Sequence, residues 1–117
     1  MTDPRRGVRA EHGAGTVLAI ALVMAVVVTG LAGVTLAAAL STRQHTIGAG
    51  ELAALAAADA ASGAIGGVPC EVAATVAAGN GTRLTACTVA GLVVSVTVSG
   101  SFGGIPIEAA ARAGPSR

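Results

Sequence analysis

The chain has 117 residues, of which 53% are hydrophobic and only 11% charged, with a formal net charge of +1. Soluble domains usually carry about a quarter charged residues, so this composition indicates a membrane environment. The length allows one modest domain plus an anchor, but not two independent cores. The scattered arginines form no basic stripe, which argues against a nucleic-acid partner. The single aromatic residue, Phe102, provides no stacking platform for bases, sugars or flat cofactors.

An uncharged segment runs from Gly13 to Thr42, 30 positions in all, and apolar residues dominate it from Val17 to Leu40. About 20 apolar residues cross a bilayer as a helix. The surplus is accommodated by tilt or by continuation beyond the membrane, at about 1.5 Å per residue. The sequence therefore predicts a transmembrane helix over residues 13–42.

Positive charge is concentrated on the N-terminal side of this segment. Arg5, Arg6 and Arg9 precede it, whereas only Arg43, with His45, follows it closely. The positive-inside rule then places residues 1–12 in the cytoplasm and residues 43–117 outside. We expect a single-pass protein of the cell membrane.

Two other interpretations of the apolar segment are a cleaved signal peptide and a buried helix of a soluble protein. A cleaved signal peptide would use Arg5 and Arg6 as its basic region and residues 37–39, all alanine, as its cleavage site. Signal-peptide cores are usually about 7 to 15 residues, shorter than this one, but the secretory interpretation stays open. A buried helix of a soluble protein fits less well, because only about 75 residues remain to cover it.

Small residues recur at every fourth position of the apolar segment, and they form a stripe at which a partner helix could approach closely. The small-residue stripe consists of Ala21, Ala25, Thr29, Gly33 and Ala37. About half of the segment is small, so a run of this kind also arises by chance. We therefore treat helix packing along this stripe as a hypothesis.

Residues 43–62 are rich in alanine, the best helix former, and predict that the helix continues as a stem outside the membrane. Leu52, Leu55 and Asp59 share one face of it, and Gly48 and Gly50 mark an expected bend. Glycines from residue 63 to residue 67 and the following proline end the stem. A short helix over residues 70–78 follows, with Pro69 in its first turn and Asn80–Gly81 at its end.

Beyond Gly81 the hydrophobic period changes to two, which is typical of strands with one buried face. Residues 92–99 alternate most clearly, with Leu92, Val94, Val96 and Val98 on one side. Residues 82–89 favour a preceding strand, joined by a short Ala90–Gly91 link. Residues 105–111 predict a third strand after Gly103–Gly104, although their alanines also suit a helix.

Cys70 and Cys87 are the two cysteines, and both fall in the part predicted to lie outside the cytoplasm. An oxidising compartment favours a disulfide between the short helix and the first strand. Two free thiols or a metal site are the alternatives. A metal site is less favoured, because no second cysteine pair exists and His12 and His45 lie far along the chain.

Residues suited to catalysis are sparse. The carboxylates of the external part are Glu51, Asp59, Glu71 and Glu108, and its one histidine is His45. No triad, paired-acid or metal-ligand spacing appears, so we expect no enzyme activity, no catalytic residue, no cofactor and no metal. Residues 80–82 (Asn-Gly-Thr) match a glycosylation sequon, but Asn-Gly is also a common turn pair, and we favour the turn.

Three segments resemble a known family. Residues 13–19 (GAGTVLA) are similar to the start of the apolar helix in TadE-like proteins of tight-adherence (Flp, type IVb) pilus systems. Residues 50–58 (GELAALAAA) are similar to the family's stretch after the membrane. Cys70 and Cys87 lie where a short actinobacterial group, named for its position near helicase and secretion genes, has its pair. The resemblance covers about residues 13–115.

The resemblance implies a minor pilin or pseudopilin, whose helix is stored in the membrane and packs with like helices during assembly driven by a separate cytoplasmic ATPase. It also implies processing by a prepilin peptidase after Gly13. One departure concerns the acidic residue that many members carry near the start of the apolar helix. Here that region is Thr16, Val17 and Leu18, which argues against processing and incorporation into a filament. A permanently anchored assembly component is the alternative.

Together these features predict an α+β protein with a transmembrane helix, a stem, a short helix, a small antiparallel sheet and one disulfide. The expected function is that of a non-enzymatic pilin-like component of a tight-adherence pilus or secretion apparatus. Its expected partners are the lipid bilayer and other pilin-like or tight-adherence membrane subunits, in a homo- or hetero-oligomer, with no small-molecule substrate. A secreted small binding domain is the main competing hypothesis, and a regulatory subunit of a membrane enzyme is a third.

Overall fold

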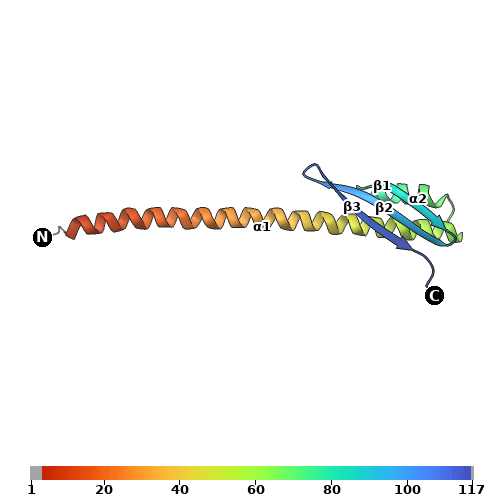
Figure 1. Ribbon diagram of the computed structural model, residues 1–117, viewed down its shortest axis with the longest axis horizontal. Coiled ribbons are helices and arrows are strands. Elements are labelled where there is room, and N and C mark those ends of the chain that lie inside the picture. The colour runs from red at the N-terminus through yellow and green to blue at the C-terminus, as the bar shows by residue number, and fades with distance from the viewer. Residues whose placement is uncertain (1–3, 117) are drawn as a thin grey trace. The chain divides into compact units, whose positions relative to one another are not determined.

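The computed structural model describes residues 4–116, with side chains from residue 13 onward, and is an α+β structure (Figure 1). Its elements are α1 (Pro4–Ser62), α2 (Pro69–Gly79), β1 (Arg83–Ala90), β2 (Val93–Phe102) and β3 (Ile105–Ala113). The chain divides into two compact units, Met1–Ala37 and Ala38–Arg117. The first consists of the N-terminal part of α1, and the second, the C-terminal unit, contains the sheet and both cysteines.

The sheet is a simple antiparallel meander in the order β1-β2-β3. Ala90 pairs with Val93 across the first turn, and Phe102 pairs with Ile105 across the second. The second turn is Gly103–Gly104, and both glycines have positive φ, of 57° and 82°. A two-residue turn with two positive φ angles matches the right-handed twist of the strands, which explains why glycine fills both positions.

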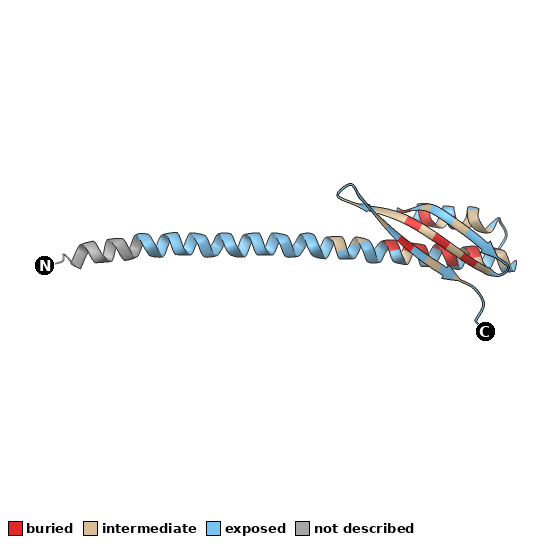
Figure 2. Cartoon of the chain, viewed as in Figure 1, coloured by how far each residue is buried: buried red, intermediate tan, exposed pale blue. Residues whose placement is uncertain are grey.

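The core of the C-terminal unit lies between the sheet and the two helices, and small side chains form it (Figure 2). Val94, Val96 and Val98 of β2 are buried, as the period-two pattern predicts. They pack in one cluster with the buried alanines of α1 (Ala53, Ala54, Ala57), of α2 (Ala73, Ala77) and of β3 (Ala109). Because alanine projects so little, α1 can lie close to the sheet.

The predicted fold class and order of elements are confirmed. Residues 105–111, which also suited a helix, are part of β3, because they pair with β2 along its length. Leu92 is not a strand residue as expected: it lies in the turn between β1 and β2 and is exposed. The short helix starts at Pro69 and ends at Gly79, one residue beyond each predicted end.

One expectation about α1 is wrong: the bend expected at Gly48 and Gly50 does not interrupt the helix. The helix also extends beyond the N-terminal end of the predicted span, since residues from Pro4 onward are helical. A Cβ built on Gly50 would lie 3.2 Å from Cγ2 of Val98, so this glycine allows the helix to approach β2 closely. Close packing, rather than bending, accounts for Gly50.

Candidate functional site: the apolar helix and the disulfide-bonded unit

The apolar part of α1 is uncovered. Every residue from 13 to 38 is exposed, including large apolar side chains such as Val17, Leu22, Val28 and Leu36. From Gly13 onward, α1 is long and apolar enough to cross a membrane, and its most apolar stretch is not buried at all. Water would disfavour so much continuous apolar surface, and either lipid or other helices would cover it favourably.

The small-residue stripe lies within this exposed segment. The Thr29 hydroxyl donates a hydrogen bond to the Ala25 carbonyl oxygen at 2.7 Å, which satisfies its polar group inside the helix. Positions four apart rotate by about 40° per step, so the stripe turns by about 160° between Ala21 and Ala37. It therefore follows the inclined row used by helices that cross at about −40° to −50°. Two or three consecutive positions could face one partner.

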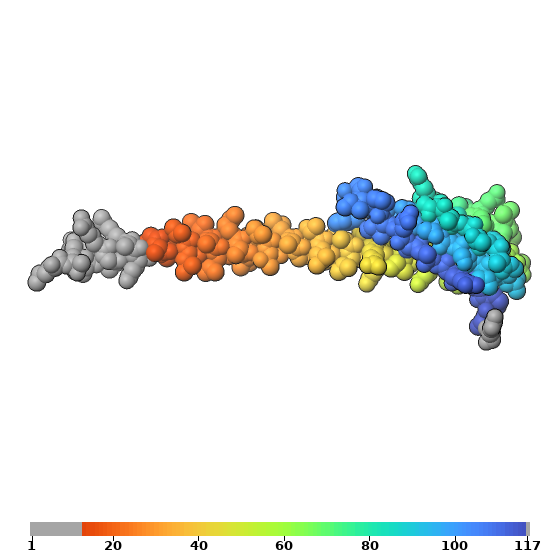
Figure 3. All heavy atoms as spheres, viewed as in Figure 1, coloured from red at the N-terminus to blue at the C-terminus, as the bar shows by residue number. Residues whose placement is uncertain are grey.

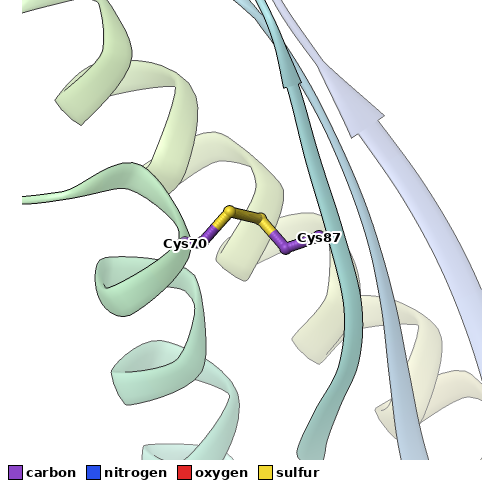
Figure 4. Close-up of a disulfide and its surroundings, with 2 residues drawn as sticks. All are labelled: Cys70 and Cys87. Carbon is purple, nitrogen blue, oxygen red and sulfur yellow. A yellow bond between two sulfur atoms is a disulfide. The ribbon is translucent and has the colours of Figure 1, made fainter.

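The predicted disulfide between Cys70 and Cys87 is confirmed (Figure 4). The two residues are 17 positions apart, and their Cα atoms are separated by 5.9 Å. The bond joins the first turn of α2 to β1. Only Ala73 and Ala77 of α2 are fully buried, and Val76 is partly buried against the same core, so few apolar side chains hold this helix on the sheet. The disulfide supplies that attachment covalently.

One hydrogen bond that the sequence did not predict fastens the end of α2 to α1. Nε2 of His45 donates a hydrogen bond to the carbonyl oxygen of Asn80 at 2.8 Å. The Gly81 and Thr82 amides donate to the carbonyl oxygens of Ala78 and Ala77, the paired bonds of a Schellman ending. The Asn-Gly pair was expected to form a turn, and this helix ending is that turn.

The sequon residues are occupied in this ending. The Asn80 side-chain amide donates to the Val76 carbonyl oxygen at 2.8 Å. The Thr82 hydroxyl is buried and donates to the Ala77 carbonyl oxygen at 2.9 Å. Both polar groups that glycosylation would need are thus engaged within the protein, and they stabilise the end of α2.

The outer face of the sheet, which points away from the helices, carries short polar side chains and is only shallowly hollowed. One depression of about 410 Å³ includes Arg83, Thr85 and Ser99, and another of about 280 Å³ includes Thr88 and Arg112. Neither brings a nucleophile, an acid and a base together. The face offers hydrogen-bonding groups without a focused charge.

The carboxylate side chains of the C-terminal unit all lie on the surface. Glu51, Asp59, Glu71 and Glu108 are all exposed. Among the residues that the structure describes, no three histidine, cysteine, aspartate or glutamate side chains could hold a metal ion together. The cysteines that were one alternative for such a site are joined to each other.

Several predicted features lie at the N-terminal end. The side chains of Arg5, Arg6, Arg9 and His12 fall outside the described residues, so the charge asymmetry that predicts orientation stays a prediction from sequence. Gly13 lies inside α1 with no neighbouring atom near its Cβ position.

No protein-family model, curated protein or solved structure matches this chain. The long apolar helix, the small sheet and the disulfide nevertheless fit a membrane-anchored protein with a pilin-like arrangement.

Proposed function

We propose that this protein is a non-enzymatic, membrane-anchored pilin-like subunit, a minor pilin or pseudopilin, of a tight-adherence pilus or secretion apparatus. The observation that carries the proposal is the uncovered apolar segment of α1 followed by a small, disulfide-linked α+β unit. The helix would be stored in the bilayer and would pack with like helices during assembly. Residues 43–117 would lie outside the cytoplasm, where disulfides form.

Three further features support this function. Residues 13–19 and 50–58 resemble TadE-like segments. The small-residue stripe is exposed on α1, so a second helix can reach it without rearrangement of this chain. The buried side of the stem is made of Ala and Gly, whereas Leu52 and Leu55 are 51% and 56% exposed on the side shared with Asp59. That side provides additional apolar surface for neighbouring subunits.

The absence of a carboxylate at Thr16, Val17 and Leu18 bears on which pilin-like role is proposed. A subunit without that charge lacks the usual partner for a neighbour's free N-terminus inside a filament. We therefore favour a permanently anchored assembly component over a major filament subunit, with Gly13 as the position at which processing would occur if a peptidase acts.

The test is co-purification from cells that carry a tight-adherence system. The tagged chain, solubilised in mild detergent, should bring down tight-adherence membrane subunits. Ala21→Leu should weaken this association, because a larger side chain fills the stripe. Ala19→Leu is the matched control, since it adds the same side chain about 200° away on the helix. Recovery of the chain free of such subunits, or equal loss in both variants, would count against the proposal.

A secreted binding domain is the competing function, and one observation favours it. The C-terminal unit begins at Ala38, so cleavage beside Ala39 would leave the whole core intact. The intact mass and the cellular fraction distinguish the two. The proposed function requires a membrane-bound chain that retains Val17 to Leu40, whereas a soluble chain that starts near Leu40 would establish secretion.

A further inference from the structure

The β2–β3 hairpin ends in two apolar residues that lie outside the buried cluster, one partly covered and one exposed. Phe102, the only aromatic residue of the chain, is half-buried and lies outside the buried cluster. Its cross-strand partner Ile105 is 67% exposed. No charged residue occurs from residue 84 to residue 107. An uncharged, apolar hairpin tip in water is unfavourable unless something covers it.

Contacts between the sheet and α1 locate this tip along the helix. A Cβ on Gly50 would meet Val98, and a Cβ on Gly100 would meet Thr46. Moving two residues along β2, from Val98 to Gly100, thus corresponds to moving four residues back along α1, from Gly50 to Thr46. The two distances agree, because a strand rises by about 3.3 Å per residue and a helix by about 1.5 Å. The next step places Phe102 level with Thr42.

Burial along α1 supports this placement. Thr42 and Ala39 are partly buried, whereas Ala38, Leu40 and Ser41 are exposed. The partly buried pair lies on the helix side that carries the buried Thr46. In Figures 1 and 3 the hairpin extends alongside the yellow part of α1, beyond the rest of the sheet. The tip therefore lies beside residues 39–42.

These helix residues coincide with the end of the predicted span. Residues 17–40 extend for about 36 Å as a helix, against about 30 Å of hydrocarbon, so the last of them reach the headgroup region. Arg43 comes directly after Thr42, and its guanidinium group suits the phosphate groups of the headgroup region. An apolar tip whose turn exposes backbone polar groups suits the interface and not the hydrocarbon centre, where such groups go unsatisfied.

We propose that the β2–β3 hairpin tip is a second membrane contact: Phe102 and Ile105 insert into the lipid interface on the side of the membrane that holds the C-terminal unit. The contact joins the sheet to the bilayer at a point separate from α1, and so restricts rotation and tilt of the unit on its anchor. The inference rests on the membrane-anchored part of the proposed function. It does not depend on a pilus.

The test uses the absence of tryptophan and tyrosine from the chain. In the full-length protein reconstituted in phosphatidylcholine vesicles, Phe102→Trp introduces one fluorophore at the tip. Lipids brominated near the headgroup end or near the methyl end of their acyl chains then report its depth. We expect a blue-shifted emission that shallow bromines quench more than deep ones. Ile105→Trp, at the more exposed position, should give the same result if replacement of Phe102 disturbs the hairpin.

Two control variants separate the outcomes. Leu92→Trp lies in the other turn, at the opposite end of the ten-residue β2 and about 33 Å away, and should be neither shifted nor quenched. Val28→Trp, in the middle of the span, should be quenched mainly by deep bromines.

Quenching of Val28→Trp without quenching at Phe102 or Ile105 would overturn the hairpin contact and leave the anchor standing. No quenching of Val28→Trp would remove the anchor and the inference together. A blue shift at the tip that bromines do not quench, and that disappears when protein is diluted in lipid, would identify a second copy as the occupant and also overturn the proposal.

Discussion

Gly100 of β2 lies so close to Thr46 of α1 that a Cβ built on the glycine would come 2.5 Å from Oγ1 of the threonine. That hydroxyl is held in place, because it donates a hydrogen bond to the carbonyl oxygen of Thr42 at 2.9 Å. Thr46 is also one of the largest side chains that are fully buried in the C-terminal unit. The pair therefore sets how closely the sheet lies on the helix.

Gly100→Ala should destabilise the C-terminal unit by about 1 to 3 kcal/mol, the usual cost of overpacking. The φ of Gly100 is not in the left-handed region, so the cost arises from the contact with Thr46 and not from the backbone. The midpoint of chemical denaturation in detergent micelles measures it. Combining the change with Thr46→Ala should recover part of the loss, and strictly additive losses would show that the two residues do not interact.

Replacement of both Cys70 and Cys87 by alanine should lower the free energy of unfolding by about 3 kcal/mol, because the closed loop then gains conformational freedom in the unfolded chain. The loss should concentrate in α2, whose two fully buried residues are both alanines. Hydrogen exchange of the α2 amides in the oxidised and reduced wild-type protein measures it. Equal protection of α2 in both states would contradict the assigned role of the bond.

Gly81→Ala should destabilise the protein by about 1 to 2 kcal/mol, because Gly81 ends α2 with a φ of +73° that disfavours any Cβ. Gly79→Ala is the matched control. Gly79 is the last residue of α2, has no atom near its Cβ position, and should be neutral or slightly stabilised by alanine. Thermal unfolding followed by circular dichroism compares them, and equal effects would argue against the Schellman ending.

Ala57→Leu should destabilise the C-terminal unit strongly, by about 1 to 3 kcal/mol or more, because Ala57 is fully buried between α1 and the sheet. Leu55→Ala, two residues away on the exposed side, should change stability by less than about 0.5 kcal/mol. Denaturation midpoints of the two variants test this. A larger loss for Leu55→Ala than for Ala57→Leu would mean that the wrong side of the stem has been assigned to the core. If neighbours use the exposed side, Leu55→Ala should instead weaken co-purification.

Local patterns account for most of the elements that were predicted correctly. An uncharged apolar run identifies a helix that is stable in a nonpolar environment, because the hydrophobicity of a segment depends on its composition alone. The period of two around Val94, Val96 and Val98 predicts the central strand and its buried face. The Gly103–Gly104 pair lies between two segments of alternating apolar residues and so predicts the second hairpin, because few residues other than glycine tolerate the positive φ angles of a two-residue turn. The cysteine pairing followed because only two cysteines exist.

The buried side of the stem could not be predicted in the same way. Hydrophobicity favours Leu52 and Leu55 as core residues, yet both are exposed, whereas Ala53 and Ala57 are buried. The sheet approaches too closely for a leucine, and that distance depends on contacts such as Gly50 with Val98, which are 48 positions apart in sequence. Neither residue alone reveals this contact.

By itself, the sequence determined that the chain has an apolar helix, a short helix, a strand-rich C-terminal part and one disulfide, since each depends on neighbouring residues or on composition. The tertiary structure decided which side of α1 meets the sheet, why Gly50 and Gly100 are glycines, and that the β2–β3 tip lies beside residues 39–42. These properties depend on distances between elements that are far apart in the chain. Packing in three dimensions sets such distances, and no local pattern of residues encodes them.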